Sequence, residues 1–501
     1  MLEAMKVITP IILLLCSGYH LPGTFSFVTD ELPKSRVIVL TDMLNEPDDS
    51  QTMVRLLMYS NEMDVEGLIA VSSCHQYAGK NDEDIVRNDV QPQAIVERIK
   101  AYGLIRENLL QHDDDWPTEE YLLGVVGRGP SGYGMWDVGD GHSTSGSEII
   151  INSLLKNDPR PVYICINAGA NTLAQAIWDL KTRVDSDTFE ACLSKIRVYD
   201  DAGQDNAGAW ISKTYPQIHY RRSQLQVFNF MNGNGPVTWE PQLEPGEGQH
   251  LWAMQNVMIG HGVLGALYPI RKQWQKNMKW HTIEGGGTST WIGHVNHGLW
   301  HPEQLGWGGW GGRFETEKAL NVRADQLKWA DLVETEEDYF PNYMYPQAVD
   351  HWVDPQTGIH YEELGAPIFR WRRAYQNDFE ARMDWCVNDF SEANHNPTAV
   401  LNGDDSDAFV FVKSEAGQWL EFDASLSRDP DGDDLSYRWF VYPEAGNVSQ
   451  PIELSGANTS RVRVRLPETQ RSENEFHLIL EVKDNGSPQL SDYRRVILVY
   501  Q

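Results

Sequence analysis

The chain has 501 residues, more than one hydrophobic core usually organises, so we expect two domains. Its 41 Lys and Arg against 72 Asp and Glu leave a formal net charge of -31. That charge repels phosphate backbones and anionic lipid surfaces, so we expect no nucleic-acid partner. The excess of carboxylates suits calcium, neutral carbohydrate or a basic ligand, although a soluble, solvated surface is the simpler explanation.

The N-terminus resembles an export signal, with Lys6 ahead of an apolar run over residues 7–16. Because this run is too short to span a bilayer, we predict a signal peptide over residues 1–26 and no membrane span. The mature protein is then secreted, periplasmic or attached to the cell surface. Cys16 is an alternative lipidation site, although Leu15 before it is not the usual small residue.

Short apolar runs alternate with helical patterns between residues 36 and 345. The predicted strands cover residues 37–40, 65–72, 162–166 and 195–199, and the predicted helices cover residues 50–61, 147–155 and 172–180. This alternation is typical of a doubly wound, mainly parallel α/β sheet, which we assign to a domain over residues 34–390.

Residues 285–314 are too rich in glycine for a regular helix or strand, so we predict a long ordered loop. Its tryptophans either pack the loop or stack on sugar rings; they are Trp291, Trp300, Trp307 and Trp310. The loop's histidines at 294, 297 and 301 match no common zinc spacing.

Residues 394–501 show short strands and frequent turns without a helical pattern, which predicts an immunoglobulin-like sandwich. The stretches 423–440 and 476–486 alternate with period two, so we expect each strand to have one buried and one solvated face. We therefore expect this domain to fold alone. Its acidic turn at 429–434 is either a calcium site or a plain turn.

Four carboxylates follow the first predicted strand within eight residues: Asp42, Glu46, Asp48 and Asp49. In open α/β sheets this strand end is where ligands bind. Clustered hard oxygens beside a helix N-terminus favour calcium, and helix capping is the alternative function.

Residues 39–50 and 65–72 resemble the opening of the nucleoside hydrolases, and residues 169–174 are similar to a later strand–helix turn of that family. The sequences at 133–135, 204–205, 309–313 and 493–496 extend the likeness. They resemble a bacterial cellulose-binding family that joins a nucleoside-hydrolase-like domain to an immunoglobulin- or cadherin-like C-terminal domain. The resemblance covers nearly all of residues 36–501.

The resemblance implies a calcium site formed by Asp42, Asp49 and the carbonyl of Ala168, with Asp48 placed against the ribose. The hydrolase aspartate that takes a proton from the attacking water falls on Leu44, so Glu46 is the candidate replacement. The candidate substrate contacts are Asn171, Asp205, Trp210, Glu284 and His297.

Two functions follow from these residues. The first is calcium-dependent hydrolysis of N-glycosyl bonds in a nucleoside-like small molecule, on or near polysaccharide. The second is non-catalytic binding of cellulose or another carbohydrate by a secreted protein. An intact catalytic base favours the hydrolase, whereas an exposed row of tryptophans favours the binding protein.

Overall fold

The computed structural model describes residues 24–27, 32–78, 89–231, 235–239, 246–269, 285–295, 297–320, 343–447, 450–468 and 474–500. Glu284, Cys16 and the predicted signal peptide up to residue 23 lie outside these residues. Among the described residues, no helix is long and apolar enough to cross a membrane.

The first domain is built on a sheet of six parallel strands, in the order β4-β3-β2-β5-β6-β7. The strands are β2 (Arg36–Thr41), β3 (Asp64–Ala70), β4 (Val126–Arg128), β5 (Val162–Ile166), β6 (Ile196–Asp201) and β7 (His219–Ser223). The chain order reverses between β2 and β5. This confirms the doubly wound α/β fold, and it places the predicted acidic loop at the point of reversal.

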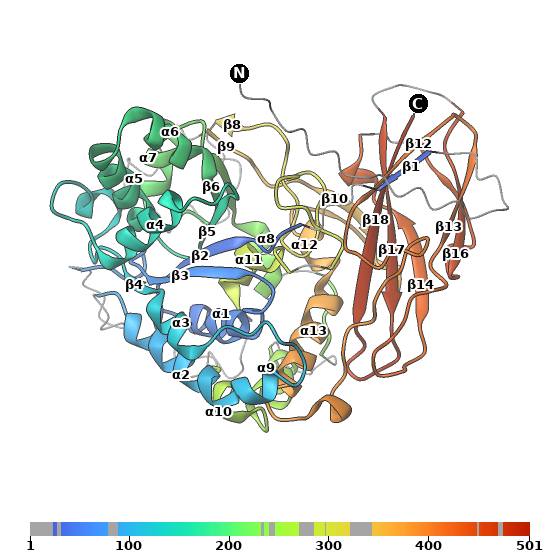
Figure 1. Cartoon of the computed structure of the whole chain (residues 1–501), viewed down its shortest axis with the longest axis horizontal. Coiled ribbons are helices and arrows are strands. Elements are labelled where there is room, and N and C mark those ends of the chain that lie inside the picture. The colour runs from blue at the N-terminus through green and yellow to red at the C-terminus, as the bar shows by residue number, and fades with distance from the viewer. Residues whose placement is uncertain are drawn as a thin grey trace, which may run out of the picture.

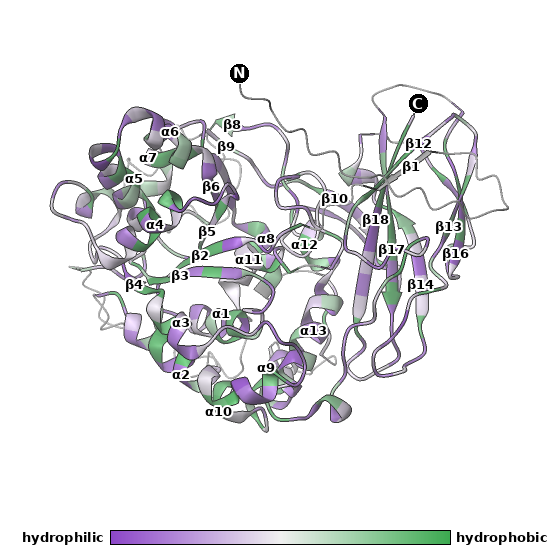
Figure 2. Ribbon diagram, viewed as in Figure 1, coloured by the Kyte–Doolittle hydropathy of each residue, from purple (hydrophilic) through white to green (hydrophobic). Residues whose placement is uncertain are grey.

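Helices cover both faces of the parallel sheet (Figure 1). The helices that share a core with one face are α1 (Pro47–Leu57), α2 (Pro92–Leu109), α8 (Leu225–Met231), α9 (Glu247–Ala253), α10 (Gly262–Gly265), α11 (Ser289–Ile292), α12 (Ala366–Phe369) and α13 (Arg372–Asp384). The other face packs against α4 (Ser145–Leu155), α5 (Asn171–Arg183), α6 (Ser186–Lys195) and α7 (Ala207–Thr214), while α3 (Glu119–Gly124) precedes β4. Val37 and Val39 of β2 enter the first core and Ile38 and Leu40 the second, which explains the continuous apolar run. Helices such as α2 carry both hydrophobic and hydrophilic residues (Figure 2).

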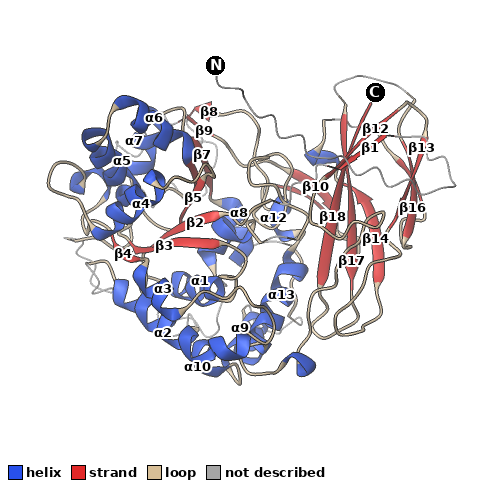
Figure 3. Ribbon diagram, viewed as in Figure 1, coloured by secondary structure: helices blue, strands red, loops and turns tan. Residues whose placement is uncertain are grey.

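The second domain consists almost entirely of strands and loops (Figure 3). One sheet has the order β1-β12-β18-β17-β14 and the other the order β13-β16-β15. The strands are β1 (Thr24–Phe27), β12 (Val410–Ser414), β13 (Trp419–Asp423), β14 (Ser436–Val441), β15 (Glu453–Ser455), β16 (Arg461–Arg465), β17 (Glu475–Lys483) and β18 (Ser491–Tyr500). The described residues also form two small strand pairs: β8 (Ala319–Leu320) with β9 (Tyr343–Met344), and β10 (Asp350–Val353) with β11 (His360–Glu363).

The glycine-rich segment 285–314 contacts both domains, and it corrects the prediction of a loop without helices, because it contains α11 and the short 3-10 helix η4 (Gly286–Thr288). Its four tryptophans are all buried, so they pack the loop and offer no exposed row for sugar stacking. Trp307 contacts Phe409 and Ile497 of the sandwich, while Arg495 of β18 donates hydrogen bonds to Leu299 O (2.8 Å) and Gly308 O (3.0 Å). Two motifs that carry the family resemblance, 309–313 and 493–496, therefore lie in segments that meet at the domain interface.

Strands β17 and β18 correct the expected alternation, because nearly every residue in them is buried on either face. The sheet face that the period-two pattern assigned to solvent, which carries Ile479 and Tyr493, packs into the core of the first domain. Independent folding of residues 394–501 stays a prediction. A fragment of that span would lack the first domain, which covers this sheet face, and it would lack β1, which pairs with β12.

His477 makes the domain interface sensitive to pH. Its Nδ1 lies 2.9 Å from an Arg495 guanidinium nitrogen and its Nε2 lies 2.8 Å from Glu475 Oε1. Burial lowers the pKa of His477 to about 4, so the unfolded chain takes up this proton first and stability is lost as pH falls from about 6.5 to about 4. Between about pH 6.5 and about pH 4, the free energy of unfolding of the parent should fall by roughly 3 kcal/mol more than that of His477→Gln, as measured by denaturant titration. A constant difference between the two proteins would contradict this role.

Candidate active site

The acidic loop after β2 lies at the carboxyl edge of the sheet, beside the loops that follow β3, β5 and β6. Asp42 is the first residue past β2, and Pro47 begins α1 with Glu46 as its N-cap. Proline suits this first helical position because its fixed φ matches the helix and its missing N–H would lack a partner there. Asp48 and Asp49 therefore lie in the first helical turn, next to the end of β2.

Asp42 and Asp49 form a buried carboxyl pair. The Thr41 hydroxyl donates to Asp49, and Asp42 Oδ2 accepts from Ser73 Oγ (2.5 Å) and Asn45 Nδ2 (3.3 Å). Burial raises the pKa of Asp42 to about 7, with smaller increases from Asp48 and Glu46. Burial and the charge of Asp42 raise the pKa of Asp49 well above its ordinary value. The pair therefore retains a proton near neutral pH.

Asp201 is a further acid at this edge of the sheet that the sequence analysis missed. It is the last residue of β6 and is buried. Burial and then the charges of Asp48 and Asp49 raise the pKa of Asp201 well above its ordinary value, so the three acids interact electrostatically. The signal was present in the sequence, because Asp201 follows the predicted strand at 195–199 at the edge where ligands bind.

Leu44 holds the position at which the resemblance expects a catalytic aspartate. Its φ is 70°, in the left-handed region that leucine rarely adopts. Its side chain packs against the main core of the first domain, so it lies among apolar groups. Glu46 is half-buried, and its charge raises the pKa of both Asp42 and Asp49, so it lies near the pair.

Asn171 and Asp205 hold loops at the same edge of the sheet. Asn171 begins α5, is fully buried, and donates to Ser72 Oγ (2.9 Å) and to Gly132 O (3.0 Å). Asp205 accepts from the backbone N–H groups of Asn171 (3.1 Å) and Ala207 (2.9 Å), and burial raises its pKa to about 7. Both side chains thus support the cleft from behind through backbone and side-chain hydrogen bonds.

The loop after β5 contributes Ala168 and Asn167. Ala168 is buried at this edge. The Asn167 backbone N–H donates to Leu40 O (2.8 Å), and its side-chain Oδ1 accepts from Thr290 Oγ1 (2.8 Å). Among the described residues, its buried Nδ2 has no hydrogen-bond partner. Asn167 therefore supplies an amide donor that the sequence analysis did not single out.

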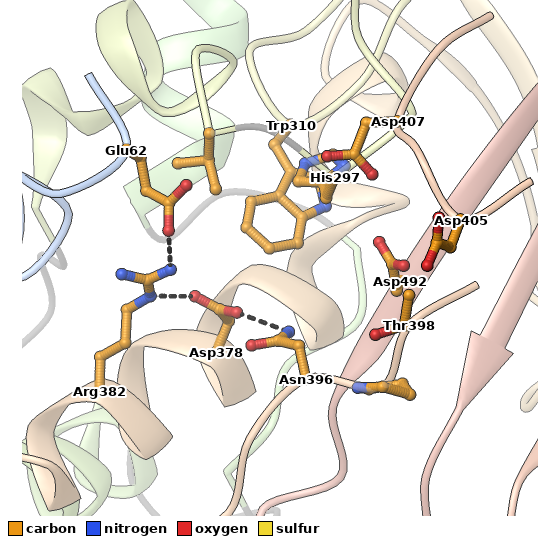
Figure 4. A pocket seen from close by; sticks show the side chains of 12 residues that line it. Glu62, His297, Trp310, Asp378, Arg382, Asn396, Thr398, Asp405, Asp407 and Asp492 are labelled. Atoms are coloured by element: carbon orange, nitrogen blue, oxygen red, sulfur yellow. Dashed lines mark hydrogen bonds and ion pairs between the residues drawn. The ribbon is translucent and has the colours of Figure 1, made fainter. Parts of the chain in front are cut away.

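The structure places Trp210 and His297 in other surroundings. Trp210 belongs to α7, and its ring lies 5.7 Å from that of Tyr215. His297 lies 4.2 Å from the Trp310 ring and lines a pocket of about 270 Å³ between the domains (Figure 4). The structure therefore does not bring these two rings together with the Asp42 and Asp49 pair.

Calcium takes about six to eight oxygen ligands, often from several carboxylates. In the part of the chain that the structure describes, no three His, Cys, Asp or Glu side chains are arranged to hold a metal ion, in the first loop or in the turn at 429–434. Hydroxyl donors cap Asp42 and Asp49 instead. The carboxylates are the right ligand type, but as arranged they do not form a calcium shell.

Fold and site together define a nucleoside-hydrolase-like α/β domain joined to a β-sandwich. The model of the cellulose-binding Sde182 nucleoside hydrolase-like domain matches residues 36–314, and that of the C-terminal domain of cellulose-binding protein Sde0182 matches residues 419–500. The chain belongs to this cellulose-binding family.

One similar solved structure comes from Saccharophagus degradans and is described as a nucleoside hydrolase-related hypothetical protein associated with carbohydrate metabolism. Its sequence is 34% identical, the match covers 94% of this chain and 100% of that one, and the TM-score is 0.76. No curated protein matches the sequence.

Proposed function

We propose that the chain binds a neutral carbohydrate, with cellulose as the first candidate, in the cleft at the carboxyl edge of its sheet. Three buried acids, Asp42, Asp49 and Asp201, lie at the same edge of the sheet as Asn167, whose side-chain Nδ2 has no hydrogen-bond partner among the described residues. This observation carries the proposal. Sugar hydroxyls both donate and accept hydrogen bonds, so they complement carboxylates and an amide together. The description of the family as cellulose-binding supports the same ligand class.

Leu44 is the reason to prefer binding over hydrolysis. In N-glycosyl hydrolysis the water oxygen forms a bond to C1 of the sugar while the C–N bond breaks. A side chain that acts as the catalytic base accepts one proton from the water. A leucine cannot accept that proton, and the partly buried Leu44 packs against the core of the first domain. We infer that the cleft keeps the shape of a hydrolase site without the group that activates water.

Slow N-glycosyl hydrolysis is the second candidate function. Asp201 favours it, because a buried carboxyl beside Asp48 and Asp49 with a raised pKa is typical of acid–base sites. Glu46 is the base that the sequence predicts, and Asp48 is the ribose contact.

Depletion of the full-length protein from solution by microcrystalline cellulose tests the proposed function. We expect saturable depletion that soluble cello-oligosaccharides compete away and that high salt leaves unchanged, because the ligand is uncharged. Equal recovery of the protein with and without cellulose, together with no heat on titration with cello-oligosaccharides, would refute it.

We propose that a calcium ion binds among the acids of the first loop. Hard oxygens gathered at Asp42, Asp48 and Asp49 favour binding of a divalent cation once the hydroxyl caps move away. Calorimetry should therefore detect calcium binding to the parent and at least about ten-fold weaker binding to Asp49→Ala, since one carboxylate ligand is lost. Equal calcium affinities for the two proteins would eliminate this site.

We also propose that the protein is secreted or held at the cell surface, where a cellulose-binding protein meets its ligand. The apolar run after Lys6 supports export. N-terminal sequencing of the mature protein from its own cells tests this; an intact residue 1 would contradict a cleaved signal.

A further inference from the structure

An exposed tryptophan lies on a loop at the same edge of the sheet as the acidic pair. Trp136, in the short 3-10 helix η1 (Gly134–Asp137), is 60% exposed. Its ring centroid lies 6.5 Å from that of Tyr77, edge-on, and 5.0 Å from that of Tyr133 beneath it. A single exposed aromatic ring needs no explanation by itself, so the inference depends on where this ring lies and how it is held.

A short chain of hydrogen bonds connects this aromatic group to Asp42. Ser73, which donates to Asp42, forms a tight turn with Gln76 through reciprocal backbone hydrogen bonds of 2.9 and 3.2 Å, and Tyr77 follows directly. Ser72 donates to Gly132 O (2.7 Å), two residues before η1. Tyr77 and Trp136 therefore lie on loops that begin at the same sheet edge as the acidic pair.

The segment that carries Trp136 is held in one conformation. Asp137 Oδ2 accepts from the Gly132 N–H (2.7 Å), and Asn206 Oδ1 accepts from the Met135 N–H (2.8 Å). Gly134 has φ 46°, and a Cβ there would lie 2.1 Å from Asn206 Oδ1, so this turn requires glycine. A backbone held in place reduces the conformational freedom that is lost when a ligand stacks on the ring, which favours binding.

We propose that Trp136, with Tyr77 beside it, stacks on a pyranose ring of a β-linked glucan chain bound at the carboxyl edge of the sheet. This site rests on the proposed carbohydrate-binding function and assigns residues to it. A neutral glucan fits because its ring faces are apolar while its hydroxyls suit the acids at the same edge. Anionic chains fit poorly, since the protein's formal net charge is -31.

The test compares three full-length variants with the parent, by cellulose depletion and by titration with cellohexaose. Trp136→Ala should weaken binding about ten-fold, while Trp136→Phe keeps a flat ring and most of the affinity. Leu104→Ala is the matched control, because Leu104 is an exposed apolar side chain (75%) on α2, and it should bind as the parent does. Far-UV circular dichroism and melting temperatures should be the same for all four proteins.

The outcomes separate this inference from the function on which it rests. If the parent binds cellohexaose and Trp136→Ala binds equally well, the stacking role of Trp136 is wrong and the carbohydrate-binding function stands. If the parent binds neither ligand, the proposed function itself fails. If light scattering shows that the parent is a dimer and Trp136→Ala is a monomer, this surface is a contact between two copies of the chain. That result would overturn the stacking role of Trp136.

Discussion

Replacing Asp350 with alanine should lower the free energy of unfolding by about 3–5 kcal/mol, because it leaves buried cations without their partner. Asp350 is fully buried and accepts hydrogen bonds from Arg313 Nε (2.7 Å), an Arg370 guanidinium nitrogen (2.9 Å) and the Tyr442 hydroxyl (2.6 Å). Tyr442 belongs to the sandwich, and the Arg370 guanidinium lies 4.0 Å from its ring centre. One carboxylate thus links the glycine-rich loop to the second domain.

Denaturant titration followed by tryptophan fluorescence measures this loss. The matched control is Asp115→Ala, which removes the exposed ion pair with Lys34 and should change stability by about 1 kcal/mol or less. Asp350→Asn keeps the shape and one acceptor oxygen, so it should fall between the two. If Asp350→Ala unfolds at the same denaturant concentration as Asp115→Ala, this carboxylate does not hold the interface.

We expect this protein to hydrolyse ordinary ribonucleosides at least about a hundred-fold more slowly than an efficient enzyme does. A catalytic group that is misplaced by about 1 Å already lowers the rate by about that factor. Leu44 cannot take the proton from water, and Glu46 reaches the cleft only from two residues further along the loop. Release of reducing sugar from a nucleoside panel, with and without calcium, measures this rate.

Any residual hydrolysis should disappear in Glu46→Gln, while cellulose binding remains. A parent that cleaves inosine or uridine at about 10 s⁻¹, a typical enzyme rate, would contradict the low rate. If Glu46→Gln then matched that rate, Asp201 would become the candidate base, and Asp201→Asn would be the variant to measure.

The sheet and the acidic loop were predictable because they depend on local patterns. The apolar runs at 37–40 and 162–166 are buried strands, and the rule that ligands bind at the carboxyl ends of parallel strands placed Asp42 and Asp49 at the cleft. Asp201 follows from the same rule applied to β6. The apolar pattern of this strand ends at Tyr199, so Asp201 lay outside the predicted strand although it ends β6.

The domain interface was not predictable from local patterns. His477 on β17 and Arg495 on β18 are polar residues between apolar neighbours, a pattern that predicts a solvated sheet face. The segment 285–314 covers them instead, and its backbone carbonyls accept hydrogen bonds from Arg495. Likewise, the sequence left open whether Trp291 and Trp310 pack or bind sugar. Their burial depends on segments more than 60 residues away, such as Tyr375 and Tyr493, which no local pattern reveals.

Titration of cellohexaose and inosine into the full-length protein, in one calorimeter with calcium present, tests the central claim most directly. Binding gives a saturating heat with cellohexaose, whereas turnover gives a steady heat that persists while substrate remains. We expect saturating heat from cellohexaose and no steady heat from inosine, because the cleft has carboxylates and an amide but a leucine at position 44. Steady heat from inosine with none from cellohexaose would show that the chain is a nucleoside hydrolase and not a carbohydrate-binding protein.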